Sequence, residues 1–183
     1  MVCVKTGIKL NRIIETERNL LRPFCMADIE PFAKICANPN VMRYIGDGKP
    51  ISRDIIAEKI AEWIQLYEQH QYGLMALVFK ETNQLIGFCG LVHQTVDDVE
   101  YIELGYRLDE TYWGKGIATE AAVAVRDYAF NVLEIPMLIS IIHHQNQASK
   151  GVAKKIGMKL MKKIHFKIVL VDVFCLTREG RLR

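Results

Sequence analysis

The stretch that decides the fold is Trp113-Gly114-Lys115-Gly116-Ile117-Ala118-Thr119-Glu120-Ala121, where the pattern of the chain changes. Before it, apolar and polar residues alternate as in a strand. After it, one apolar face recurs at helical spacing until Pro136, formed by Ile117, Ala121, Ala124, Val125, Tyr128 and Val132. The glycines therefore predict a turn into a helix. The first turn of a helix carries unpaired N–H groups and partial positive charge, so an anion can bind there.

Spacing argues against two common nucleotide-binding loops at this turn. A P-loop requires Ser or Thr directly after Gly-Lys, but Gly116 follows Lys115. A dinucleotide fingerprint requires Gly or Ala where this sequence has Thr119, and Glu134 falls late in the helix rather than after a second strand. From these residues alone, a plain helix entered through a glycine turn remains open.

Composition describes an ordinary globular chain of 183 residues, with 50% apolar residues, 25% charged residues and a formal charge of +3. This length fits one domain with its own hydrophobic core. The charge is too small, and the basic residues are too dispersed, to predict direct binding of nucleic acid. A mild positive excess suits an anionic small ligand equally well.

The cysteines and the N-terminal residues indicate where in the cell the protein is expected. Five scattered cysteines without a CxxC pair argue against a zinc ribbon or a thioredoxin-type site and indicate reduced thiols. Residues 1–12 lack the apolar stretch of a secretion signal, and later apolar runs are too short for a membrane span. We expect a cytoplasmic protein without a membrane partner, with a tail over 1–12 and one domain over 13–183.

The remaining pattern predicts a mixed α+β fold. The expected elements are a strand over 13–22, a helix over 28–36, a loop over 40–49, a helix over 53–69 capped by Ser52, a hairpin over 72–80 and 85–93, a strand over 100–108, the helix after Gly116, a strand over 137–142, a helix from Asn146 to Ile156, and two strands within 159–178. The helix over 53–69 has an apolar stripe of Ile55, Ile56, Ile60, Trp63, Ile64 and Tyr67. The strands joined by the helix after Gly116 are expected to be parallel.

The strand over 100–108 separates two kinds of side chain. One face carries Ile102, Leu104, Tyr106 and Leu108, and the other carries Tyr101, Glu103, Gly105 and Arg107. The apolar face is expected to meet the core, which leaves Glu103 and Arg107 together on the opposite face.

The glycine turn resembles the pyrophosphate loop of the GNAT acetyltransferase superfamily, Gln/Arg-x-x-Gly-x-Gly/Ala. Trp113 takes its first position, Gly116 its fourth and Ala118 its sixth. The form over 113–121 is similar to the branch of ribosomal-protein N-terminal acetyltransferases (RimJ/RimL-like). The resemblance covers nearly the whole chain, with further matches at Glu17–Pro23, Asn40–Ile45, Glu103–Tyr106, Asn146–Ser149 and Lys155–Met158.

The resemblance implies the GNAT fold, a mixed and mostly antiparallel sheet whose fourth and fifth strands splay apart around acetyl-CoA. Those strands correspond to 100–108 and 137–142, with Gly105 at a β-bulge. The implied cofactor contacts are the backbone of Leu104, Tyr106 and Leu108 to the pantetheine arm, and Trp113, Gly114, Lys115, Gly116, Ile117, Ala118 and Thr119 around the pyrophosphate.

Acetyl transfer also needs an acid for the departing thiolate. Many members of the superfamily use a tyrosine in the second cofactor helix, but this chain has Ala153 at that position. The RimJ/RimL-like branch instead suggests Ser149, three residues after Asn146. Ser149 could equally support the first helical turn. Asn146 is expected both to cap the helix and to contact the cofactor.

Glu103 is the preferred general base, and a surface ion pair with Arg107 is the alternative interpretation of its position. His143 is a weaker candidate base. We expect no metal, because His143 and His144 have no further ligands in the sequence pattern. Lys115, Lys150 and Lys154 could attract coenzyme A phosphates, and Lys115 is the best placed of the three.

The predicted function is therefore transfer of the acetyl group of acetyl-CoA to a primary amine, by direct attack in a ternary complex. The amine is that of a protein N-terminus or of a small molecule. A non-catalytic acyl-CoA sensor or interaction module on the same fold is the alternative. Residues 26–49 and 53–69 are expected to form the acceptor wall, with Tyr44 and Trp63 lining it. A monomer and a homodimer both remain open.

Overall fold

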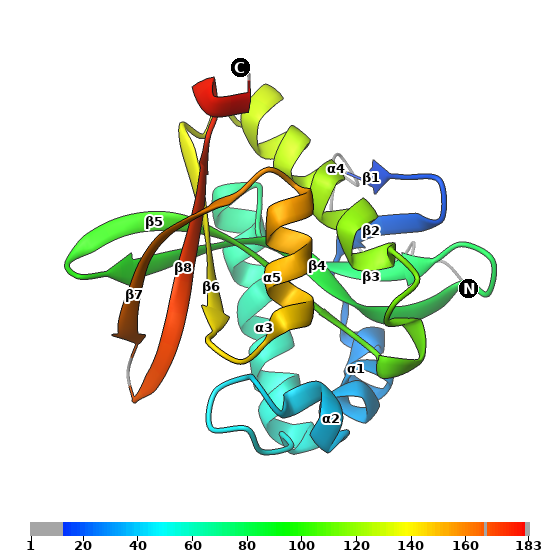
Figure 1. Ribbon diagram of the computed structural model, residues 1–183. Helices are drawn as coiled ribbons and strands as arrows, with labels where there is room; N and C mark the ends of the chain where they lie inside the picture. The colour runs from blue at the N-terminus through cyan, green and yellow to red at the C-terminus, as the bar shows by residue number, and fades with distance from the viewer. Residues whose placement is uncertain (1–12, 167, 182–183) are drawn as a thin grey trace.

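A computed structural model describes residues 13–166 and 168–181 as one sheet flanked by helices (Figure 1). The expected tail over 1–12 lies outside the described residues. The main elements are β1 (Ile14–Glu15), β2 (Asn19–Pro23), α1 (Ile29–Cys36), α2 (Pro39–Met42), α3 (Arg53–His70), β3 (Leu74–Phe79), β4 (Gln84–Val96), β5 (Val99–Leu108), α4 (Ile117–Asn131), β6 (Met137–His143), α5 (Gln147–Lys155), β7 (Lys159–Phe166) and β8 (Val169–Thr177). Short 3-10 helices cover Met26–Asp28, Glu110–Tyr112 and Glu179–Arg181.

The sheet has the strand order β1-β2-β3-β4-β5-β6-β8-β7, and its described neighbours are antiparallel except for β5 and β6. Helix α4 connects these two parallel strands, as predicted. Only Ile102–Leu138 and Glu103–Ile139 pair between them. Beyond these pairs the strands diverge, so the splayed strands predicted over 100–108 and 137–142 are confirmed as β5 and β6.

Two hydrophobic clusters pack on opposite faces of the sheet. One contains Val125 of α4 and joins α4 and α5 to the strands. The other contains Phe32 of α1 and Ile60 of α3. Because successive strand residues point to opposite faces, β3 contributes Leu77 to the first cluster and Ala76 to the second. The helices α4 and α5 therefore cover one face, and α1 and α3 cover the other (Figure 1).

The single strand predicted over 13–22 is wrong, because the chain turns within it. Strands β1 and β2 form a hairpin in which the Thr16 N–H donates to the Asn19 carbonyl at 2.9 Å. Glu120 of α4 holds this turn by accepting hydrogen bonds from Thr16, Arg18 and Asn19. Glu120 is about a hundred residues from this turn in the sequence, so the local alternation of apolar and polar residues does not predict its contacts.

The loop predicted over 40–49 begins within the short helix α2. The Asn38 side chain accepts from the Asn40 N–H at 2.9 Å, and Pro39 occupies the first helical position. The pair Asn-Pro ends α1 as predicted, but it also starts α2, because proline is tolerated where no N–H partner is needed.

The predicted Ser52 cap of α3 is confirmed, whereas two apolar assignments are wrong. Ser52 accepts from the Ile55 N–H at the start of α3. The Ile55 side chain itself is 47% exposed, however, and Val132 is 58% exposed. Helix α4 ends at Asn131, before Pro136, so Val132 has already left the buried face.

The bulge predicted at Gly105 is wrong. Gly105 pairs regularly with Gly90, and the β4–β5 register runs without a shift from Gly87–Leu108 to Val96–Val99. Register shifts lie instead between β3 and β4, at Leu77 and Val78, and between β7 and β8, at Leu160 and Lys162. A Cβ at Gly90 would lie 2.3 Å from the Gly73 carbonyl oxygen, so close backbone approach explains Gly90 rather than Gly105.

Candidate active site

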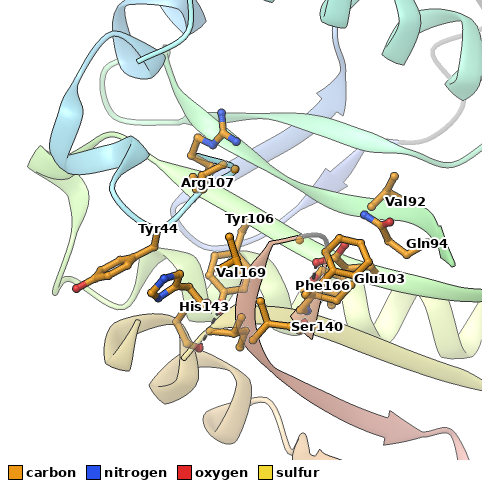
Figure 2. Close-up of a pocket in the computed structure, with 18 of the residues that line it drawn as sticks. Tyr44, Val92, Gln94, Glu103, Tyr106, Arg107, Ser140, His143, Phe166 and Val169 are labelled. Carbon is orange, nitrogen blue, oxygen red and sulfur yellow. Dashed lines mark hydrogen bonds between the residues drawn. The ribbon is translucent and has the colours of Figure 1, made fainter. Parts of the chain in front are cut away.

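A cavity of about 680 Å³ opens where β5 and β6 separate (Figure 2). Its walls come from these two strands, from β3 and β4, from the loop after α2, from α3, from the first turn of α5 and from the end of the β7–β8 hairpin. Seven predicted site residues line it, namely Tyr44, Trp63, Glu103, Leu104, Tyr106, His143 and Ser149. Leu108, Asn146 and the glycine turn over 113–119 are not part of its lining.

The glycine turn adopts the geometry that the sequence predicts. Gly114 has φ +73 and Gly116 has φ +77, a left-handed conformation that side chains disfavour. The first helical bond runs from the Glu120 N–H to the Gly116 carbonyl at 3.0 Å. The N–H groups of Ile117, Ala118 and Thr119 therefore precede that bond and point out of the helix start. Lys115 is exposed beside them, with its Nζ 5.6 Å from the Tyr112 ring centroid.

Trp113 ties the glycine turn to the end of β5. Its indole Nε1–H donates to the Leu108 carbonyl at 2.9 Å, while its side chain remains 48% exposed. The Arg18 guanidinium secures the turn from the other side, because its Nη1 donates to the Lys115 carbonyl at 2.9 Å. The turn is thus fixed at both ends by side chains.

Glu120 is a structural centre that the sequence analysis missed. Its Oε1 accepts from the Thr16 hydroxyl at 2.6 Å, from the Arg18 N–H at 2.8 Å and from the Asn19 amide at 3.0 Å. Its Oε2 lies 2.7 Å from Arg18 Nε. Partial burial raises the pKa of Glu120, but the hydrogen bonds from Thr16 and Arg18 outweigh it and leave the pKa below its usual value. Glu120 therefore anchors the first turn of α4 to the β1–β2 hairpin.

The free edge of β5 offers backbone groups to the cleft. The Asp109 N–H donates to the Ile86 carbonyl at 2.8 Å, so the alternating residues Leu104, Tyr106 and Leu108 point their backbone groups away from β4. The Leu104 carbonyl already accepts from the Ser140 hydroxyl at 2.7 Å. No strand among residues 13–166 and 168–181 pairs with this edge beyond Glu103.

Ser149 lies in the first turn of α5, beside β5. The Asn146 side chain accepts from the Ser149 N–H at 3.0 Å, which confirms Asn146 as the N-cap. The Ser149 hydroxyl lies 2.8 Å from the Tyr106 hydroxyl. Ala153, at the position where other superfamily members have a tyrosine, is fully buried.

Glu103 is a partly buried carboxyl group with backbone and side-chain donors. Its Oε1 accepts from the Ile141 N–H of β6 at 3.2 Å. Burial raises the pKa of Glu103 to about 7, against the opposing effect of hydrogen bonds from Ile141 and Gln94. The carboxyl group therefore changes its charge near neutral pH.

The ion pair considered between Glu103 and Arg107 is not present. Arg107 Nη1 donates to Cys36 Sγ at 3.2 Å, and its guanidinium packs on the rings of Phe32 and Phe88 at 5.9 and 5.4 Å. Figure 2 shows this guanidinium directed away from the other labelled residues. The two side chains share a strand face, yet they serve different parts of the molecule.

His143 is poorly suited to act as a base. Burial, followed by the charges of His144 and Lys150, lowers the pKa of His143. Its Nδ1 accepts from the Gln145 N–H at 3.1 Å, which assigns the proton of the neutral ring to Nε2. The remaining ring nitrogen is thus a donor, and the ring packs 5.1 Å from that of Tyr44.

Lys150 does not have the free charge considered in the sequence analysis. Its Nζ lies 2.5 Å from buried Asp172 and donates to the His144 carbonyl at 2.5 Å. This ion pair connects α5 to β8. Lys154 is exposed on α5, whereas Lys115 lies in the glycine turn itself and is exposed there.

Tyr44 and Trp63 line the cavity from different surroundings. Tyr44 belongs to the loop after α2 and contacts His143. Trp63 packs in the second hydrophobic cluster, with its ring 5.2 Å from Phe24 and 5.7 Å from Phe88. Trp63 is therefore both a wall of the cavity and part of the core.

Residues 13–166 and 168–181 contain no group of three or more His, Cys, Asp or Glu side chains that could hold a metal ion. None of their helices is both long and apolar enough to cross a membrane.

Known proteins identify the family. A model of the acetyltransferase (GNAT) domain matches residues 18–159. The chain is 33% identical over 156 residues to the uncharacterized protein YkkB of Bacillus subtilis, across 81% of this chain and 86% of YkkB. A solved acetyltransferase from Agrobacterium tumefaciens is 31% identical, with a TM-score of 0.76 over 90% of this chain and 94% of that one. The chain belongs to the GNAT acetyltransferase family.

A more distant structure shares the fold. RimL, a ribosomal L7/L12 α-N-protein acetyltransferase solved in complex with coenzyme A, is 16% identical to this chain. Its TM-score is 0.78 over 91% of this chain and 98% of RimL.

Proposed function

We propose that this chain transfers the acetyl group of acetyl-CoA to a primary amine, either a protein N-terminal α-amine or the amine of a small molecule. The observation that carries this proposal is the cavity between the splayed strands. A partly buried carboxyl group with a pKa of about 7 and a serine hydroxyl line the same space there. The sequence form over 113–121 and the pair Asn146/Ser149 support a place in the RimJ/RimL-like branch.

The chain fits acetyl-CoA at two places. The edge of β5 leaves the backbone groups of Tyr106 and the N–H of Leu108 for the amides of the pantetheine arm, because the Leu104 and Leu108 carbonyls already accept from Ser140 and Trp113. The N–H groups at the start of α4 suit a pyrophosphate. Lys115 adds a positive charge at the same turn. When bound, acetyl-CoA supplies the thioester whose carbonyl carbon the amine attacks.

Glu103 acts as the general base in this proposal. A carboxylate must be ionised to accept a proton from the amine, and a pKa of about 7 leaves a large ionised fraction at neutral pH. The same raised pKa makes Glu103 a stronger base than an exposed carboxylate. Tyr44 and Trp63 form the wall that orients the acceptor.

Ser149 acts on the departing sulfur in this proposal. The Asn146 side chain caps α5 by accepting from the Ser149 N–H, which holds Ser149 in place. The Ser149 hydroxyl is therefore not needed as the cap. A hydroxyl at this point can donate to the thiolate as negative charge develops. Attack is direct, so the step needs neither a metal nor a covalent enzyme intermediate.

Incubation with acetyl-CoA and a panel of peptides, amino acids and small amines tests the proposal, with free thiol as the readout. We expect thiol release that depends on the acceptor, and acetylated amine detected by mass spectrometry. In Ser149→Ala we expect kcat to fall about a hundredfold while the KM for acetyl-CoA changes little. Tight binding of acetyl-CoA without acceptor-dependent turnover would instead favour the sensor.

A further inference from the structure

The side chain of Tyr106 has no part in the scheme above, where only its backbone serves the cofactor. Tyr106 projects from β5 toward α5 and joins the hydrophobic cluster under α4 and α5. Its hydroxyl lies 2.8 Å from Ser149 Oγ and 3.0 Å from the Ser149 carbonyl oxygen. Both residues also line the cavity. The phenol therefore contacts the one hydroxyl that the proposed reaction uses.

These two distances permit two arrangements of hydrogen. A carbonyl oxygen only accepts, and a phenol has a single proton to donate. When Tyr106 donates to the Ser149 carbonyl, the Ser149 hydroxyl satisfies itself by donating back to Tyr106. When Tyr106 donates to Ser149 Oγ, the Ser149 proton is free to point into the cavity. In the first arrangement the Ser149 proton is held by Tyr106, whereas in the second it is available to a sulfur atom in the cavity.

Tyr106 keeps its own proton throughout. Burial raises the pKa of Tyr106 far above its usual value, against the lowering effect of the Ser149 hydrogen bond and with a smaller raising effect from Cys89. The phenol therefore stays protonated and remains a hydrogen-bond donor. Its contact with Ser149 lets it act through that hydroxyl.

We propose that Tyr106 is a positioning residue that turns the Ser149 hydroxyl toward the departing sulfur. As the amine nitrogen bonds to the acetyl carbon, the carbon–sulfur bond breaks and its electron pair stays on sulfur. The Ser149 O–H remains intact and donates a hydrogen bond to that thiolate, while the amine proton goes to Glu103. This inference rests on the proposed acetyl transfer.

Tyr106→Phe tests the inference, because it removes only the hydroxyl and keeps the ring in its cluster. We expect kcat to fall about tenfold, the scale of one oriented hydrogen bond, with the KM for acetyl-CoA unchanged. In a Ser149→Ala background the same substitution should have no further effect, because no hydroxyl remains to be oriented. Tyr101→Phe is the matched control, since Tyr101 lies on the same strand but not in the cavity lining, and its kcat should equal that of the unchanged chain.

The outcomes separate this inference from the proposed function. An unchanged kcat in Tyr106→Phe, or losses that multiply in the double variant, would overturn the inference and leave acetyl transfer standing. A lower melting temperature in Tyr106→Phe with a matching rise in the KM for acetyl-CoA would assign Tyr106 a structural role and also overturn it. Absence of acceptor-dependent turnover in the unchanged chain would overturn both.

Discussion

The two sides of the cleft are built in different ways. The proposed cofactor side consists of the β5 edge over 104–108, the start of α5 and the glycine turn over 113–119, which lies outside the cavity lining. These short segments offer mainly backbone groups. The proposed acceptor side consists of the loop over 44–47, Trp63 and the end of the β7–β8 hairpin, which are far apart in the chain and offer side chains. A site made from backbone groups tolerates change of side chains, whereas a site made from side chains can be altered one residue at a time.

The largest expected effect concerns Glu103, which lies where the two sides meet. Glu103→Gln should lower kcat by about two to four orders of magnitude, because the amide cannot accept the amine proton. In the unchanged chain, kcat/KM should rise with pH through a midpoint near 7, since the carboxyl group is neutral below its pKa of about 7 and ionised above it. A pH–rate profile of both proteins measures this.

Glu100→Gln serves as the control for that substitution. Glu100 lies on the same strand, is exposed and accepts from the Thr95 hydroxyl at 2.6 Å. We expect Glu100→Gln to keep both the kcat of the unchanged chain and its rise of kcat/KM with pH. If Glu103→Gln retained the rise with pH, Glu103 would not be the base.

Two glycine substitutions test the cofactor side and the acceptor side separately. Gly116→Ala and Gly46→Ala each force alanine into a left-handed conformation, at φ +77 and φ +58, which costs about 1–2 kcal/mol. The new methyl group meets no backbone in either case. We expect Gly116→Ala to raise the KM for acetyl-CoA about tenfold, and Gly46→Ala to raise the KM for the acceptor by a similar factor. Initial rates measured while each substrate is varied in turn would show both effects. If each variant raised the KM for acetyl-CoA and the KM for the acceptor by the same factor, the two sides would not be separate.

The smallest expected effect is on stability and falls on the cofactor side. Glu120→Gln should lower the free energy of unfolding by about 1–2 kcal/mol at neutral pH, because it weakens three hydrogen bonds and an ion pair. We place it at the low end, since Arg18 is 38% exposed. The pKa of Glu120 is lowered in the folded chain, so its contribution is present above the unfolded value and is lost as pH falls through the folded value.

Denaturant unfolding at several pH values measures that contribution. The difference between Glu120→Gln and the unchanged chain should shrink in acid. Exposed Glu62 on α3 offers a control, and Glu62→Gln should be neutral at every pH. A difference between Glu120→Gln and the unchanged chain that stayed constant down to pH 3 would contradict the assigned role.

The sequence predicts features that depend on neighbouring residues. The order of most elements, the turn into α4, the Asn146 cap and the parallel pair β5–β6 all follow from local periodicity and from glycine, asparagine and proline chemistry. The β1–β2 hairpin was missed because Glu120 holds it from a distant helix. The partners of Glu103 and Arg107 were missed for the same reason, since Ile141 and Cys36 reach them only through the fold.

Side-chain contacts between segments limit the prediction of the site in the same way. The Tyr106–Ser149 contact joins β5 to α5 across more than forty residues, and the sequence indicated only the backbone of Tyr106. The one available signal was the Tyr106 hydroxyl, a polar group on an otherwise apolar strand face. A buried phenol needs a hydrogen-bond partner, so such a residue predicts a contact without naming the partner.

Hydrogen–deuterium exchange with and without acetyl-CoA tests the central claim most directly, since it needs no knowledge of the acceptor. We predict slower exchange at the amides of Tyr106 and Leu108, at residues 114–119 and at the start of α5. Residues 44–47 and 168–169 should exchange as before. Protection of those acceptor-side residues alone, with none at the glycine turn or the β5 edge, would contradict the account.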